Sequence, residues 1–180
     1  MHKFASEIIG KKVLLRQEGR ITGAVDELVI NPSNGEFLGL IIAVTGQKRL
    51  QKTLPEREIM GISRDFILIK SADSLGDLDD VVRIKNVLEQ RIRIDGNRVY
   101  TVSNIYLGKV ADYVIDLSDG KLSRIYVQTR GLSKIAGQCI VESRQIVSIK
   151  KERITVIDAV VKKEKQLRAK GVTVRSESKC

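Results

Sequence analysis

The sequence lacks tryptophan and contains one histidine and two cysteines among its 180 residues. Two cysteines exclude a disulfide framework, and no cysteine or histidine pairs show the spacing of a zinc site. The single histidine, His2, lies beside a chain end that we expect to be mobile, and no second histidine accompanies it in a nucleophilic triad. Glycine-rich nucleotide-binding motifs are missing as well. The sequence therefore predicts a protein that is not an enzyme and has no cofactor and no metal site.

Long apolar runs are also missing, so we expect no transmembrane segment. The first residues have no secretory hydrophobic region. Cys139 stands in an apolar run and is expected to be a buried, inert thiol, whereas Cys180 is too near the end of the chain for prenylation. Because no feature points to an oxidising or membrane compartment, we expect a cytoplasmic protein.

The chain is rich in Val, Ile and Leu, and it has 14 glycines but only two prolines. β-Branched residues suit the pleated surface of a sheet, and glycines serve the tight turns between short strands. Residues 37–44 form an almost continuous apolar run, which predicts a strand buried on both sides. The composition therefore favours a mainly β fold.

One segment of the chain occurs twice, because residues 23–35 are echoed 85 residues later by residues 108–120. A repeat this far apart marks a domain-sized unit rather than the short period of a solenoid. The identical pairs are Gly23/Gly108, Val25/Val110, Val29/Val114, Ile30/Ile115, Ser33/Ser118 and Gly35/Gly120. We therefore predict two small β-barrels in tandem.

The repeated segment has a glycine inside its predicted strand and a turn at its end. Gly23 and Gly108 indicate a bulge or a close backbone crossing. The turns end in residue pairs that favour a positive φ, namely Asn34-Gly35 and Asp119-Gly120. Asp116 and Asp119 resemble a fragment of a calcium loop, but the remaining ligand positions are missing, so we interpret them as turn residues.

The predicted organisation follows from these repeats and turns. The parts are barrel 1 at residues 1–70, an acidic linker at 71–80, barrel 2 at 81–158, and a basic C-terminal helix and tail at 159–180. In barrel 1 we expect strands at 11–16, 21–30, 37–44 and 65–69, with a short helical turn at 54–60.

Barrel 2 is expected to repeat this order after an opening helix. That helix would be capped by Asp79 or Asp80, run to about Glu89 and precede a hairpin of residues 92–94 with 99–102. The later strands are expected at residues 104–115, 122–128, 139–141 and 153–157, and Asp158 is expected to cap the basic helix.

Positive charge is concentrated in the second half of the chain. Residues 1–82 hold 11 Lys/Arg and 12 Asp/Glu, a net of −1, whereas residues 83–180 hold 21 and 10, a net of +11. Such an asymmetry favours an anionic partner for the second half, although a solubilising surface gives the same pattern. The candidate anion- or RNA-binding residues are Arg91, Arg93, Arg98, Lys150, Lys151, Arg153, Lys162, Lys163, Lys165 and Arg168.

The four tyrosines also lie in this half, and planar rings beside cations are typical of RNA-binding surfaces. The same residues can also be explained without a ligand, because tyrosine is favoured in strands and the charges can form a solvated face. An anionic membrane surface is a further partner for the cluster, although the tail has few large apolar residues for insertion.

Two sequence features together resemble the PRC-barrel family. The first is a glycine, an apolar–acidic alternation, an Asx-x-x-Asx-Gly turn and a buried strand, and the second is a turn into Glu-Ile-x-x-Ile and a final strand. The resemblance covers residues 6–69 and, more weakly, residues 87–157. The family includes the cytoplasmic domain of the photosynthetic reaction-centre H subunit and the C-terminal domain of the ribosome maturation factor RimM. It implies small bent barrels that dock onto larger assemblies and catalyse nothing themselves.

These observations leave two functional hypotheses. The first is a non-enzymatic adaptor that binds a larger protein assembly through tandem PRC-barrels. The alternative is an RNA-binding or ribosome-maturation type of factor that uses the basic second half.

Overall fold

The computed structural model describes residues 1–47, 50–79, 81–129 and 137–160, and it divides into two compact units. Unit 1 comprises residues 1–92 and 112–123, and unit 2 comprises residues 93–111 with the chain from residue 124 onward. In the described ranges, no helix is long and apolar enough to cross a membrane. Each unit is described by itself below.

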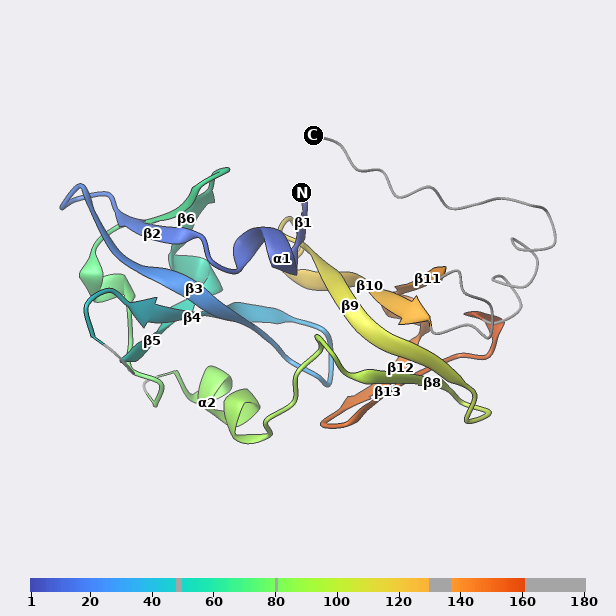
Figure 1. Cartoon of the computed structure of the whole chain (residues 1–180). Coiled ribbons are helices and arrows are strands. Elements are labelled where there is room, and N and C mark those ends of the chain that lie inside the picture. The colour runs from blue at the N-terminus through green and yellow to red at the C-terminus, as the bar shows by residue number, and fades with distance from the viewer. Residues whose placement is uncertain (48–49, 80, 130–136, 161–180) are drawn as a thin grey trace. The chain divides into compact units, whose positions relative to one another are not determined.

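The sheet of unit 1 has six strands in the order β5-β4-β3-β2-β7-β6. Figure 1 shows β5, β4, β3 and β2 next to one another. The β2/β7 pair is parallel, and the other neighbours in this order are antiparallel. The strands are β2 (Lys12–Leu15), β3 (Arg20–Ile30), β4 (Phe37–Val44), β5 (Gln51–Pro55), β6 (Ile59–Ile62) and β7 (Phe66–Ile69). All four strands expected in the first barrel are therefore present.

The core of unit 1 is aliphatic, as the composition predicted. The first six residues of β4 are buried, which confirms the strand expected to be covered on both sides. Gly23 marks a close approach of β3 to its neighbour β4, because a Cβ atom there would overlap the carbonyl oxygen of Ala43. The fully buried side chains in this unit include Ile8, Leu15, Leu40, Ile42, Leu54, Ile67 and Ile69.

Four short helices accompany this sheet: α1 (Ala5–Ile8), the 3-10 turns η1 (Glu56–Glu58) and η2 (Ala72–Ser74), and α2 (Val82–Glu89). The predicted helical turn near Pro55 is η1, and Pro55 lies just before its first residue.

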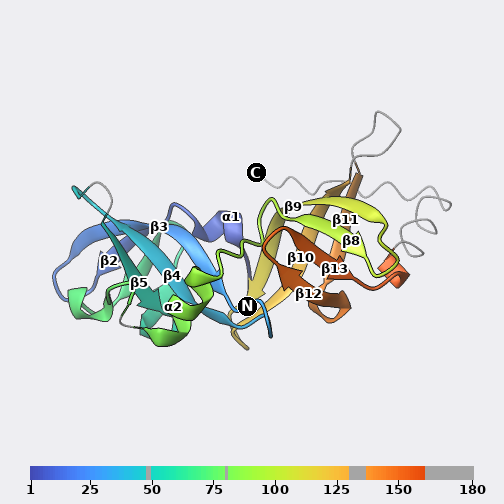
Figure 2. The same ribbon diagram turned by 90° about the horizontal axis from the view of Figure 1, so that it is seen from below.

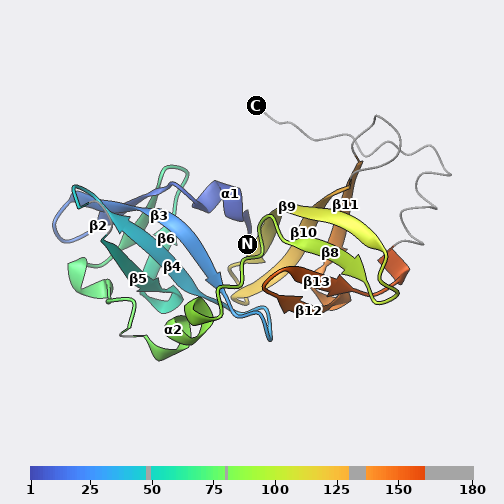
Figure 3. The same ribbon diagram turned by 60° about the horizontal axis from the view of Figure 1, so that its bottom comes forward.

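Helix α2 belongs to unit 1, whereas we had expected it to open the second module. Its buried residues Ile84 and Val87 pack against Leu38 and Ile41 of β4, and Figure 3 shows the helix beside this strand. Its N-cap is Val81. Of the two expected caps, Asp79 instead forms an ion pair with Lys85 at 3.0 Å, and Asp80 lies outside the described residues. The apolar side of the helix packs against apolar residues of the first sheet, and this packing explains why the helix belongs to unit 1.

The acidic segment at residues 71–79 is held against β5. Ser71 and Ser74 are buried, Gly76 forms an isolated β-bridge with Thr53, and Lys52 pairs with Asp77 at 2.6 Å. This segment, which we had described as a linker, therefore forms part of the packed structure of unit 1.

Unit 1 also includes residues 112–123, which are the end of β9 (Tyr106–Asp116), the turn after it and the start of β10 (Lys121–Thr129). Strand β1 (His2–Phe4) pairs antiparallel with the end of β9, with Lys3 opposite Ile115. In the same turn the carbonyl of Gly120 accepts a hydrogen bond from the Phe37 amide at 2.8 Å. The N-terminus, expected to be mobile, is thus a paired strand.

The second sheet has the same arrangement of strands as the sheet of unit 1. Its order is β11-β10-β9-β8-β13-β12, with a parallel β8/β13 pair. Figure 2 shows β8, β13 and β12 next to one another. The elements are β8 (Arg98–Thr101), β9 (Tyr106–Asp116), β10 (Lys121–Thr129), β11 (Gly137–Glu142), η3 (Ser143–Gln145), β12 (Ile146–Lys150) and β13 (Arg153–Val156). Residues 106–111 of β9 and 124–129 of β10 belong to unit 2.

The duplication extends to the register of the strands. Val13 lies opposite Gly23 in unit 1, and Val99 lies opposite Gly108 in unit 2. In both pairs the register shifts immediately afterwards, as expected for a bulge at this glycine. The predicted mainly β fold of two tandem barrels is confirmed; residues 161–180, most of the expected basic helix and tail, lie outside the described part.

The predicted hairpin of residues 92–94 with 99–102 is wrong. Strand β8 has β9 on one edge and β13 on the other, so no edge remains for residues 92–94. The Asp158 side chain accepts hydrogen bonds from the Ser103 amide at 3.1 Å and hydroxyl at 2.8 Å, directly before the helical residues 159 and 160. The remainder of the helix that Asp158 was expected to cap lies outside the described residues.

Candidate functional surfaces: the outer faces of the two sheets

The outer face of unit 2 has a row of four cations across four neighbouring strands. Lys150 of β12 lies opposite Arg153 of β13, Arg153 lies opposite Arg98 of β8, and Arg98 lies opposite Lys109 of β9. Residues directly opposite one another project from the same face of a sheet. We call these four residues the basic row.

Three members of the basic row are exposed, and the fourth, Arg153, is half-buried. The Arg153 guanidinium lies 4.3 Å from the ring centroid of Tyr100, a cation–π distance that explains its partial burial. None of the four cations forms an ion pair with a carboxylate of the described residues. The row is therefore a line of positive charge that no carboxylate of the described residues compensates.

A second row on the same face consists of hydroxyl-bearing side chains. Ser148, Thr155, Tyr100 and Tyr106 lie opposite one another in turn on β12, β13, β8 and β9. The rings of Tyr100 and Tyr106 are 5.1 Å apart between centroids, and Tyr106 is 45% exposed. We call these four residues the hydroxyl row and the two rows together the basic face.

Asn97 holds one end of the basic face in place. Its side-chain amide donates hydrogen bonds to the carbonyls of Lys150 at 2.7 Å and Arg93 at 3.0 Å. Its side-chain oxygen accepts from the amide of Arg98 at 2.8 Å. Because Asn97 is only 7% exposed, these contacts tie the start of β8 to the end of β12 beside the basic row.

The structure brings together only part of the predicted basic set. Arg98, Lys150 and Arg153 lie in the basic row, and Lys151 lies in the adjacent β12–β13 turn. Sequence reasoning missed Lys109, although the alternation of exposed and buried residues along β9 could have indicated it. The other predicted cations of the tail, Lys162, Lys163, Lys165 and Arg168, lie outside the described residues.

Arg91 and Arg93 are not in the row. Arg91 follows α2 in unit 1 with a φ of 52°, and Arg93 pairs with Asp95 at 3.4 Å. Among the tyrosines, Tyr113 is buried in the core and Tyr126 is half-buried on β10. Only Tyr100 and Tyr106 therefore accompany the cations.

The equivalent face of unit 1 has a different chemistry. At the positions of Arg153, Arg98 and Lys109, unit 1 has Phe66, Lys12 and Ala24 in the same register. At the positions of the hydroxyl row it has Gly61, Leu68, Leu14 and Ile21. We call the side chains Phe66, Leu68, Leu14 and Ile21 the apolar face.

Two members of the apolar face are well exposed, Phe66 at 37% and Ile21 at 46%. Leu14 and Leu68 between them are half-buried. The exposed charged residues that border these strands in the sequence are the cations Lys12, Arg16, Arg20, Arg64 and Lys70 and the carboxylates Glu18 and Asp65. The face is thus an apolar patch on a sheet surface with a mainly basic surround.

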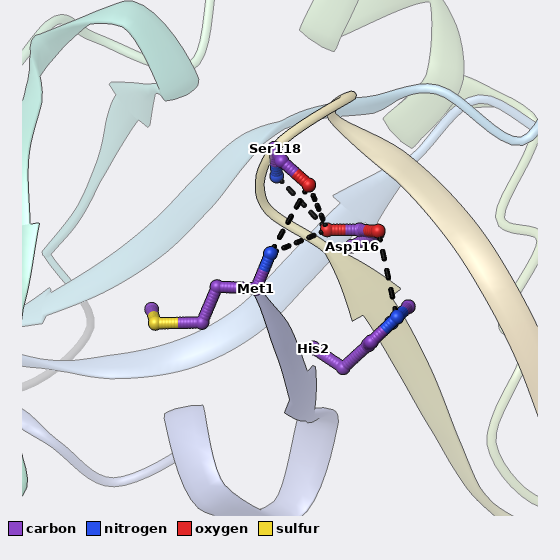
Figure 4. Close-up of polar contacts among 4 residues, drawn as sticks. All are labelled: Met1, His2, Asp116 and Ser118. Carbon is purple, nitrogen blue, oxygen red and sulfur yellow. Dashed lines mark hydrogen bonds and ion pairs between the residues drawn. The ribbon is translucent and has the colours of Figure 1, made fainter.

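The only histidine lies in a polar cluster with the turn of unit 1 (Figure 4). The Met1 ammonium donates to Asp116 at 2.8 Å and to the Ser118 hydroxyl at 3.1 Å, and His2 Nε2 is 3.6 Å from Asp116. The ammonium contact first, and then the hydrogen bonds from Ser118, hold the pKa of Asp116 well below its usual range. A carboxylate kept ionised in this way fixes the turn and is a poor general base.

The turn residues of the two repeats have defined local geometry. Gly35 and Gly120 have φ values of 72° and 62°, and Asn34 accepts a hydrogen bond from the Glu36 amide at 3.0 Å. Asp119 lies in the turn before Gly120. Over the described ranges, no group of three His, Cys, Asp or Glu residues converges as a metal site.

Two sheets with the same strand order, the same parallel pair and the same bulge define a tandem repeat of a small β-domain. The chain belongs to the PRC-barrel domain family, whose sequence model matches residues 1–86 and again residues 90–161. Domains of this family are generally protein-interaction modules. A comparison with curated proteins gave no match.

Proposed function

We propose that this protein is a non-enzymatic adaptor that docks onto a larger protein assembly through the apolar face of unit 1. The family supports an interaction role, since PRC-barrel domains are generally protein-interaction modules. The single observation on which the proposal depends is the apolar face, where Phe66 and Ile21 remain exposed on the outside of a sheet.

The chemistry of this face describes the partner. Exposed aromatic and aliphatic residues that lie side by side are typical of the centre of a protein interface. The exposed charged residues that border the strands of this face are mainly cations, with Glu18 and Asp65 as the carboxylates. We therefore expect a protein partner with an apolar patch that is bordered mainly by acidic residues.

A quantitative capture experiment tests this function. The tagged full chain is used to isolate proteins from the cell of origin after nuclease treatment, and Phe66→Ser with Ile21→Ser is compared with the wild type. Central anchors in an interface dominate its binding free energy, so we expect the recovered partner to bind at least about tenfold more weakly. The purified partner is then titrated against both chains.

Val82→Ser is the matched control, because Val82 is also an exposed aliphatic residue of unit 1, on α2. It should leave binding unchanged. Equal binding of all three chains, or measured turnover of a substrate, would exclude the proposed docking role. Loss of the partner on nuclease treatment would show tethering through a nucleic acid, and recovery only with anionic vesicles would show membrane contact.

A further inference from the structure

We propose that the basic face of unit 2 binds a single-stranded nucleic acid, with phosphates on the basic row and bases on the tyrosines of the hydroxyl row. This activity is separate from the docking role of unit 1. The proposal starts from the cross-strand register, which places Lys150, Arg153, Arg98 and Lys109 side by side on one face.

The first argument is the cost of such a row. Like charges directly opposite one another on neighbouring strands are destabilising. The basic row has three such contacts in succession, and the ion pairs of the described residues include none to its members. An anionic ligand would convert this repulsion into attraction.

The second argument is the shape of the charge. Neighbouring strands are about 4.8 Å apart, so four cations on successive strands form a line about 14 Å long. A single phosphate or carboxylate contacts only part of such a line, whereas a linear polyanion follows its whole length. The row therefore matches a chain of phosphates better than a small anion.

The third argument is the neighbouring hydroxyl row. Tyr100 is two residues after Arg98 on β8, which places its ring on the same face and about 7 Å along the strand. Tyr106, 45% exposed, lies opposite it. Aromatic rings beside a basic track are the means by which proteins stack the bases of single strands.

This arrangement also distinguishes the nucleic acid from other polyanions. An acidic peptide or a lipid headgroup would use the cations, but neither has planar bases for the tyrosine rings. A duplex keeps its bases stacked inside and leaves the rings without partners. Hydroxyls of Ser148 and Thr155, which complete the row, can hydrogen-bond base edges or sugar.

Unit 1 provides an internal reference for the proposal. Its equivalent positions hold Phe66, Lys12 and Ala24, so one cation replaces three, and the positions of Tyr100 and Tyr106 hold Leu14 and Ile21. The scaffold itself therefore demands neither the cations nor the aromatic rings at these positions.

Salt-dependent binding tests the basic row. The full chain is titrated into a fluorescein-labelled, mixed-sequence single-stranded RNA of about 12 nucleotides and into DNA of the same sequence, with anisotropy as the readout. Four phosphate contacts contribute a slope of about −2.8 in log K against log salt, or about 50-fold between 50 and 200 mM. Arg98→Gln with Lys109→Gln should reduce the slope by about 1.4, whatever the rest of the chain contributes.

The matched control is Lys12→Gln with Lys70→Gln, which removes two exposed cations from unit 1. It should leave the slope unchanged. An equal change of slope in both double variants would show diffuse charge attraction and overturn the site. Absence of binding by the wild type would overturn it as well.

The tyrosines are tested separately, because stacking is independent of salt. Tyr106→Ala should weaken binding about 5- to 150-fold for one stacked base, with the same salt slope. Tyr106→Phe, which keeps the ring, should bind like the wild type. Unchanged affinity of Tyr106→Ala, or equal binding of the RNA duplex or of poly-glutamate, would show that bases are not recognised and would overturn the proposal.

Discussion

Unit 1 and unit 2 have the same scaffold, but their outer surfaces differ in chemistry. Both sheets have the same strand order, the same parallel pair and the same bulge beside a glycine. Where unit 2 has Arg153 and Tyr100, however, unit 1 has Phe66 and Leu14. The comparison teaches that the inward-facing residues define this fold, while the outward-facing residues of the same strands were able to diverge.

The shared core leads to the largest expected effect. Leu40 of β4 and Ile125 of β10 are equivalent and fully buried, and each lies opposite a buried residue, Leu54 and Val141 respectively. We expect Leu40→Ala and Ile125→Ala each to lower the free energy of unfolding by about 2–5 kcal/mol. Urea unfolding followed by circular dichroism measures both. A loss below about 1 kcal/mol in only one variant would contradict the equivalence of the two cores.

Asn97 provides the next effect. It is buried and its side chain makes three hydrogen bonds, so Asn97→Ala leaves the carbonyl of Lys150 and the amide of Arg98 without a side-chain partner. We expect a loss of about 1–3 kcal/mol in the free energy of unfolding. In unit 1 the equivalent residue is Lys11, whose exposed contact with the carbonyl of Arg64 is expected to matter less. Thermal unfolding measures both variants. A larger loss of stability for Lys11→Ala than for Asn97→Ala would contradict the structural role given to Asn97.

Transfer of the basic row onto unit 1 tests whether surface residues alone make the difference. Phe66→Arg with Ala24→Lys places two cations beside Lys12 in the register of the basic row. If the row binds phosphates, raising the salt from 50 to 200 mM should weaken single-strand binding by this variant about seven times more than it weakens binding by the wild type. Fluorescence anisotropy gives the slope, and an unchanged slope would show that the row needs more of unit 2 than its charges.

The smallest expected effect comes from an ion pair in unit 1. Arg83 of α2 donates to Glu36 at 2.6 Å, and this hydrogen bond, followed by that from Asn34, lowers the pKa of Glu36. A carboxyl with a lowered pKa stabilises the folded state above its unfolded pKa, and this stability is lost as the pH falls through the folded value. Arg83 is 65% exposed, so the contribution is at most about 1 kcal/mol.

The corresponding residue of the second repeat is Lys121, so the pair has no equivalent there. Arg83→Gln should therefore reduce stability at neutral pH by a few tenths of a kcal/mol and reduce the loss of stability on acidification. Unfolding in urea at several pH values below neutrality measures this. An unchanged pH profile would mean that the pair contributes nothing.

The sequence predicted those features that local rules determine. The repeat around Gly23 and Gly108, the Asn34-Gly35 turn and the buried strand at residues 37–44 each depend on a few neighbouring residues. The structure has a close approach of β3 to β4 at Gly23, a positive φ at Gly35 and a fully buried start of β4.

Features that depend on distant partners were missed. The hairpin expected at residues 92–94 is excluded because β13, 55 residues after β8 in register, occupies the second edge of β8. Helix α2 packs on β4 because of Leu38 and Ile41, which no local pattern links to it. Lys109 joins the basic row only through the register of β9 with β8, so charge counting alone could not select it.

The inclusion of residues 112–123 in unit 1 has a consequence for how the chain is made. Strand β1 pairs with residues 114–116, and the amide of Phe37 donates to Gly120. During synthesis the first unit therefore stays incomplete after its own sheet has left the ribosome, until the chain has grown past residue 120. A fragment that stops at residue 92 contains the six strands of the first sheet but neither of these two contacts. The boundary of a stable fragment therefore differs from the boundary of the repeated sequence.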